Sequence, residues 1–330
     1  MSKNKNKILI DPRFALEIRD LEDFLAEFGP FNGRYVPRFP TDWPKRLREH
    51  LEELAIERLH PVKKQSLLEK LRRELNLCTE PVNWEWQEEK TWKQNIQHQS
   101  RRADNALVIG DGIDPAPFAS WEETIDQIRG TRRRSWPFHG TVSEYIAACR
   151  PLLLNSPAAY LIDCYLDPLS EVAESLVRSL LSLINGSRCF SIEIITRRSA
   201  CGLRTRNFDD IPINDEELAD RMNKIYMPFI PRERQIVLNI VEEGRFGSDS
   251  LKLHDRFFLT IHGSINFGQG FLLVNQKLPQ QNAFITDKEH HQHLKDTFIE
   301  GVANFHRLSK RKSQIAYPLS VTKIHIANIH

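Results

Sequence analysis

Residues 159–197 constrain the fold of this chain more than any other stretch. Residues 159–166 are apolar on both faces of an extended segment, as in a strand buried in the middle of a sheet. Pro168 opens an amphipathic helix that ends at Asn185-Gly186, and residues 191–197 form a second strand. A helix between two such strands favours parallel pairing through a right-handed crossover. This stretch therefore predicts an α/β fold.

The chain after residue 197 continues in the same manner. A helix is expected over 214–227, a strand over 234–241, a hairpin over 251–273, a helix over 286–308 that Thr286 or Asp287 caps, and a last strand over 320–326. Because a hairpin pairs its strands antiparallel, we expect a mixed sheet rather than a purely parallel one.

The first hundred residues follow a different pattern. Apolar residues recur at three- and four-residue steps over 11–28, 42–59 and 61–75, and a fourth helix is predicted over 83–102. A short strand is expected at 106–109. A chain of 330 residues is too long for one ordinary core. We therefore predict a mostly helical N-terminal domain over 1–120, a basic linker region over 121–150 and an α/β domain over 151–330.

The hairpin carries the most distinctive polar residues. His254 and Arg256 are two positions apart, so both are expected to point to the same face of the first strand. Gly268 and Gly270 are expected on the return strand, where the missing side chains would let another group approach the backbone. An imidazole and a guanidinium that face the backbone of glycines could bind an anionic oxygen group between them. The predicted phosphate-binding residues are Ser264, Asn266, Gly268 and Gly270.

These residues resemble the site motif of the phospholipase-D-like superfamily. That motif has His-x-Lys, an Asp seven residues after the His and a Gly near the fourteenth. Here His254 takes the first place, Arg256 stands where Lys is expected, and Gly268 is fourteen residues on. The resemblance is closest to the phospholipase-D-like C-terminal domain of MIT-domain proteins, which carries His-Asp-Arg. His-Asp-Arg versions also occur in bacterial proteins of genome-conflict systems.

The resemblance implies a phosphodiesterase chemistry. In such enzymes one His attacks phosphorus and a second, from a duplicated motif or a dimer partner, protonates the leaving oxygen. Arg256 is then expected to bind the phosphoryl oxygens in place of the usual Lys. The expected acid is missing, because Ile261 occupies its position, and Asp163 would substitute if its strand lies beside the hairpin. The predicted catalytic residues are His254, Arg256 and Asp163.

The missing acid leaves two hypotheses open. The first is a phospholipase-D-like nuclease, cytoplasmic and dimeric, that acts in bacterial antiviral defence. The second is a degenerate, non-catalytic module that binds a partner protein, a nucleic acid or a phosphoinositide within a larger assembly. The implied partners are a nucleic acid and a second copy of the chain or other assembly components, and no cofactor is expected.

A basic cluster precedes the α/β domain. Arg132, Arg133 and Arg134 are followed closely by Trp136, a combination that would grip a nucleic-acid backbone and stack a base. The alternative is a solvated loop, which such charge runs usually form.

Composition and the remaining histidines complete the expectations. Five scattered cysteines without a Cys-x-x-Cys pair indicate a reducing compartment, and no signal peptide or membrane-spanning segment is expected. Near-balanced charge, +2 overall, excludes binding to nucleic acid by bulk charge alone. Glu289, His290, His291 and His293 raise the possibility of a metal site. On a helix only Glu289 and His293 share a face, and no third ligand follows at suitable spacing. We therefore expect these residues to form a helix surface without a metal.

Overall fold

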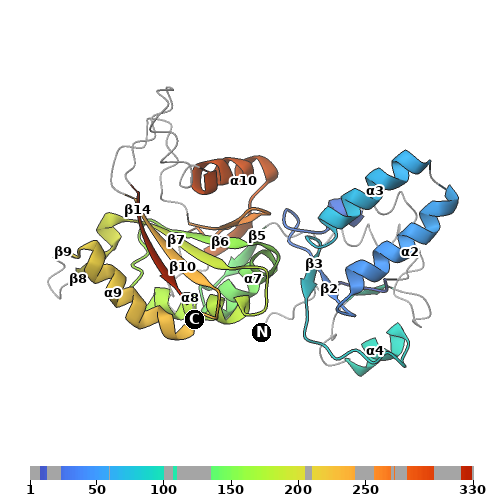
Figure 1. The fold of residues 1–330 in the computed structure, drawn as a ribbon, viewed down its shortest axis with the longest axis horizontal. Helices are drawn as coiled ribbons and strands as arrows, with labels where there is room; N and C mark the ends of the chain where they lie inside the picture. The colour runs from blue at the N-terminus through green and yellow to red at the C-terminus, as the bar shows by residue number, and fades with distance from the viewer. Residues whose placement is uncertain are drawn as a thin grey trace. The chain divides into compact units, whose positions relative to one another are not determined.

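The structure is a computed structural model that describes residues 8–12, 24–58, 60–99, 107–109, 135–204, 210–241, 256–268, 271, 281–300 and 321–328. The chain divides into two compact units, Met1–Arg134 and Ser135–His330 (Figure 1). Residues 135–150, which the sequence analysis placed in the linker region, belong to the second unit and form a strand and the first part of a helix.

The first unit mixes helices with short strands, so the prediction of a mostly helical region omitted its strands at 8–10, 36–38 and 79–81. β1 pairs with β4 and β2 pairs with β3, both in parallel. Its core includes Trp43, whose indole N–H donates to the Ile10 carbonyl at 2.6 Å. The elements are β1 (Ile8–Ile10), β2 (Val36–Arg38), α2 (Trp43–Arg58), α3 (Pro61–Glu74), β3 (Thr79–Pro81), α4 (Trp92–His98) and β4 (Leu107–Ile109).

The helix predicted over 83–102 is wrong at its start. Residues 82–87 have no regular structure, and α4 begins only after Thr91, whose hydroxyl accepts from the Gln94 N–H in a capping box. Trp84 and Trp86 lie before the helix and pack edge-on against Phe39. Three closely spaced tryptophans resemble a helical stripe, but here two of them cover a loop.

The second unit has the predicted α/β fold. Its sheet has eight strands in the order β14-β10-β7-β6-β11-β12-β13-β5. β6, β7 and β10 run parallel, whereas β14, β11, β12, β13 and β5 each run antiparallel to a neighbour, so the sheet is mixed. The strands are β5 (Ser135–Phe138), β6 (Ala158–Ile162), β7 (Ser191–Arg197), β10 (Gln235–Val241), β11 (Phe257–Thr260), β12 (Ser264–Asn266), β13 (Gln281–Ile285) and β14 (Val321–Ala327).

Helices cover both faces of this sheet. α7 (Val142–Asn155), α8 (Glu171–Ile184) and α9 (Asp215–Tyr226) pack on one face, and α10 (Lys288–Leu294) packs on the other (Figure 1). A π-helical segment, Lys295–Glu300, follows α10. The short pair β8 (Gly202–Arg204) and β9 (Asp210–Pro212) forms a separate ribbon between β7 and α9.

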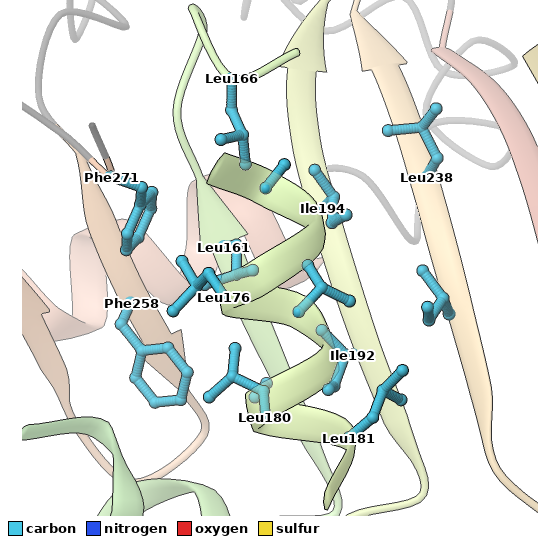
Figure 2. Close-up of a cluster of buried hydrophobic side chains, with 14 of the residues drawn as sticks. Leu161, Leu166, Leu176, Leu180, Leu181, Ile192, Ile194, Leu238, Phe258 and Phe271 are labelled. Atoms are coloured by element: carbon cyan, nitrogen blue, oxygen red, sulfur yellow. The ribbon is translucent and has the colours of Figure 1, made fainter. Parts of the chain in front are cut away.

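The predicted β-α-β unit is confirmed. α8 begins after Ser170, whose hydroxyl accepts from the Ala173 N–H, and its apolar stripe faces the sheet. Figure 2 shows Leu176, Leu180 and Leu181 of α8 lying against apolar residues of β6 and β7. Removing one such leucine side chain costs about 2–5 kcal/mol. This packing fixes the spacing of the parallel strands, and therefore the geometry at their ends.

The hairpin and the last helix depart from their predicted bounds. β11 and β12 pair antiparallel as predicted, but β12 ends at Asn266 rather than continuing to residue 273. Asp287 caps α10 by accepting from the His290 N–H, and the α-helix proper ends at Leu294, before the π-helical segment that ends at Glu300. Residues 301–308 of the predicted helix lie outside the described part of the chain.

Candidate anion-binding site

The topology brings five separated residues to one edge of the large sheet. β6 and β7 end at Ile162 and Arg197 at the same edge, since they are parallel. β11 is antiparallel to β6, with Phe257 opposite Ile162, so the residue before β11 also lies at this edge. β12 ends there too, because Asn266 pairs with Phe257. We call Asp163, Tyr165, Arg197, Arg256 and Gly268 the carboxyl edge.

Asp163 is the buried centre of the carboxyl edge. Its side chain is 3% exposed. Its Oδ1 accepts from the Tyr165 backbone N–H at 2.9 Å and lies 3.4 Å from Arg256 Nε. Its Oδ2 accepts from the Phe271 N–H at 3.3 Å. The carboxylate therefore joins the end of β6 to the start of β11 and to the segment after β12. As the sequence analysis required, β6 and β11 are neighbours, and Asp163 reaches the hairpin.

Arg256 is held on two sides and is mostly buried. Besides its contact with Asp163, Nη1 donates to the Gly268 carbonyl at 3.1 Å. Its side chain is 16% exposed, and its guanidinium carbon lies 5.3 Å from the centre of the Tyr165 ring. A buried ion pair of this kind fixes geometry, and its charge is largely neutralised by the partner. Arg256 is therefore better placed to organise the edge than to reach out to an anion.

Arg197 is the second cation of the carboxyl edge. It ends β7, is half-buried, and its guanidinium carbon lies 5.6 Å from the centre of the same Tyr165 ring. None of the ion pairs within the described part of the chain involves Arg197. Tyr165 is 43% exposed. Two guanidinium groups thus converge on one exposed ring, with one carboxylate between the strands to balance them.

Cys164 lies between Asp163 and Tyr165 but is not an activated thiol. Burial raises its pKa, which outweighs the opposing influence of the Arg197 and Arg256 charges. A protonated, buried thiol is a poor nucleophile. The edge is therefore suited to binding rather than to thiol chemistry.

Gly268 is needed for its backbone conformation. It lies after β12, not on it as predicted, and has a φ of 58°, which favours glycine. Its N–H donates to Asn266 Oδ1 at 2.7 Å, while its carbonyl accepts from Arg256. Asn266 therefore stabilises the turn that presents this carbonyl.

The structure brings some predicted site residues together and separates others. Asp163, Arg256, Asn266 and Gly268 meet at the carboxyl edge. Ser264 lies at the opposite end of β12, beside the hairpin turn, where it is 1% exposed. Trp136 lies in β5 and packs against the main core. The remaining predictions concern residues outside the described part of the chain: His254, Gly270, Arg132, Arg133 and Arg134.

Ser264 belongs to a buried polar cluster that the sequence analysis missed. Its hydroxyl contacts Thr286 Oγ1 and lies 3.2 Å from His291 Nδ1, while His291 Nε2 lies 3.4 Å from the Ile261 carbonyl. A carbonyl only accepts, so Nε2 carries the proton and Nδ1 accepts from Ser264. We call Ser264, Thr286 and His291 the turn cluster.

The prediction that the histidines of this helix lie on its surface is wrong for His291. His291 is 4% exposed on α10, and burial lowers its pKa, helped by the charges of Lys295 and His262. The described residues contain no group of three or more His, Cys, Asp or Glu side chains that could hold a metal ion. The spacing of His291 and Leu294 on one helix face was the available signal for its burial.

Comparisons with known proteins leave the chain without an assigned family. No family model and no curated protein matches it. Among solved structures it is similar to TrmBL2, described as an archaeal chromatin protein with a novel mode of DNA binding. The two share 11% identity over 88% of this chain and 93% of that chain, with a TM-score of 0.25. A score this low carries no inference about fold or function. Within the described residues, no helix is long and apolar enough to cross a membrane.

Proposed function

We propose that the second unit binds the phosphodiester backbone of a nucleic acid at the carboxyl edge. The observation that carries this proposal is Arg197, a half-buried guanidinium beside Tyr165 that forms no ion pair within the described residues. A guanidinium is planar, always charged, and matches a phosphate group with two parallel N–H donors. Open α/β sheets bind ligands outside the carboxyl ends of their parallel strands, which is where Arg197 lies.

Arg256 and Asp163 support this role without needing to touch the ligand. Their contact holds the start of β11 against the end of β6, and Arg256 lies 5.3 Å from the Tyr165 ring that it shares with Arg197. In this proposal Arg197 contacts the phosphate, and Arg256 positions the surroundings.

A phospholipase-D-like phosphodiesterase or nuclease is the second candidate, and the position of Asp163 favours it. The carboxylate contacts Arg256, the last residue of the His254-Asp255-Arg256 segment, which supports a role for Asp163 as the acid that the motif lacks. In this version His254 attacks phosphorus, and a second copy of the chain supplies the other imidazole. Genome defence would be the biological setting.

Binding is tested by changing one charge at the edge and one elsewhere. Arg197→Gln in the full chain should weaken binding of a fluorescent oligonucleotide by about tenfold, because a charge-assisted contact is lost. It should also reduce the salt dependence by about one phosphate contact. Arg221→Gln, which removes an exposed arginine of α9, is the matched control and should change neither. Equal losses in both variants would show that binding is non-specific and remove the proposed site.

Cleavage is tested with the same oligonucleotide. The wild-type chain and His254→Ala are incubated with it, with and without divalent metal, and products are separated by electrophoresis. Products from the wild type and none from His254→Ala support the phosphodiesterase. Binding by the wild type without any product would reject the phosphodiesterase and support the non-catalytic binding module.

A further inference from the structure

Tyr165 combines an exposed side chain with a fixed backbone. It is 43% exposed, although it lies only three residues after the buried strand β6, and two arginines lie over its ring. Its backbone is fixed, since its N–H donates to Asp163 Oδ1 and the next N–H, of Leu166, donates to the Asp163 carbonyl at 3.2 Å. The ring is therefore presented to solvent by a rigid, buried anchor.

The two guanidinium groups lie over this ring, but at a greater distance than in a close cation–π contact. Their carbon atoms are 5.3 and 5.6 Å from the ring centre. By comparison, Arg178 lies 3.8 Å from the centre of the Phe229 ring, the separation of direct stacking. Arg197 thus supplies the positive charge beside Tyr165, Arg256 being paired with Asp163, and 43% of Tyr165 remains exposed.

An exposed ring beside a cation is the combination that binds an unpaired base and its phosphate together. Aromatic side chains accept the face of any base, and nearby arginines contact the backbone. In a duplex each base is stacked on its neighbours and paired at its edge, so its face cannot reach a protein ring without unstacking. A single strand presents both groups at no such cost.

We infer that the carboxyl edge takes single-stranded nucleic acid, with one base stacked on Tyr165 and an adjacent phosphate on Arg197. This inference rests on the proposed function and names its substrate class. Stacking of one base is expected to strengthen binding by about tenfold relative to the same backbone without a base. The sequence of the strand should matter little, because every base has a face to stack.

The experiment compares three fluorescent probes on the full chain by anisotropy. They are a single strand of about 12 nucleotides, within the length that one binding fold covers, the same strand in a blunt duplex, and a single strand whose central sugars carry no base. The single strand should bind about tenfold more tightly than either of the others. Tyr165→Leu should remove the difference between the normal and abasic strands, and Tyr165→Trp should keep it.

Phe229→Leu is the matched control, since Phe229 is also 43% exposed and lies beside an arginine, but in the short 3-10 turn Met227–Phe229 that follows α9. It should change none of the three affinities, and circular dichroism melting checks that each variant is folded. Duplex binding as tight as that of the single strand, or an unchanged preference in Tyr165→Leu, would overturn the inference while leaving phosphodiester binding intact. Failure of all three probes to bind would instead reject the proposed function itself.

Discussion

The two ends of the β11–β12 hairpin differ in how completely their polar side chains are buried. Both place polar side chains where the sheet meets a loop. At the turn end, Ser264, Thr286 and His291 bond to one another and to backbone and are almost fully buried. At the open end, Arg256 and Asp163 are also paired, but Arg197 and Tyr165 beside them keep exposed surface. A closed polar network stabilises a fold, whereas a network with accessible charge at its border can also bind a ligand.

The largest expected effect comes from breaking the open end. Asp163→Asn leaves the Arg256 guanidinium without its charged partner in a mostly buried position, and should lower the free energy of unfolding by about 3–5 kcal/mol. Urea denaturation measures this change. The double variant Asp163→Asn with Arg256→Met should recover much of the loss, because no unpaired charge remains. If the double variant is as unstable as the single one, the ion pair is not what holds this end.

A smaller effect is expected at the turn end. Ser264→Ala removes the hydroxyl that donates to His291 Nδ1 and should cost about 1–3 kcal/mol, the range for leaving a buried polar atom unsatisfied. Ser175→Ala, on the exposed face of α8, is the control and should cost far less. Oligonucleotide binding should be unchanged in both. A loss of binding in Ser264→Ala at a temperature where it is folded would contradict the separation of the two ends.

Gly268→Ala tests the backbone of the open end. A φ of 58° costs an alanine about 1–2 kcal/mol, so stability should fall by about that amount. Gly186→Ala, at a φ of 75° in the turn after α8, should cost a similar amount. Only Gly268→Ala should also weaken oligonucleotide binding, because its carbonyl accepts from Arg256. Equal binding by the two variants would show that this carbonyl does not position the edge.

The smallest effect is the pH dependence contributed by the turn cluster. Burial lowers the pKa of His291 in the folded state, so the unfolded chain binds the extra proton first as the pH falls. The stability contributed by the neutral imidazole is therefore present above about pH 6.5 and is lost below it, by at most about 1.4 kcal/mol per pH unit. His291→Asn should flatten the plot of unfolding free energy against pH between 7.5 and 5.5.

The regular parts of the second unit were predictable because their residues repeat. The strand at 191–197, the helix at 215–226 and the parallel β-α-β unit follow from apolar periodicity alone. The pairing of Arg256 with Asp163 was within reach, since the hairpin and the first strand were both identified. Arg197 was overlooked because nothing in its neighbourhood in the sequence distinguishes it. Its importance comes from Tyr165, which is 32 positions away in the chain but lies beside it at the carboxyl edge.

The turn cluster escaped prediction for a related reason. A run with three histidines suggests a solvated helix surface or a metal, and the serine that makes His291 a buried residue lies 27 positions earlier. The tryptophans at 84 and 86 show the opposite error. Their close spacing in the sequence suggested a helix, whereas in the structure they pack against Phe39 from a segment without regular structure.

The contact between Asp163 and Arg256 joins residues 93 positions apart, because the strand paired with β6 is made only after β7 and β10. During synthesis the ribosome must therefore add nearly a hundred residues before the carboxylate meets its cation. Until then the nascent sheet has an open border at β6 with unpaired backbone groups and an uncompensated charge. Until β11 covers it, this border can pair with a strand of another chain, which is the hazard that exposed strand borders carry.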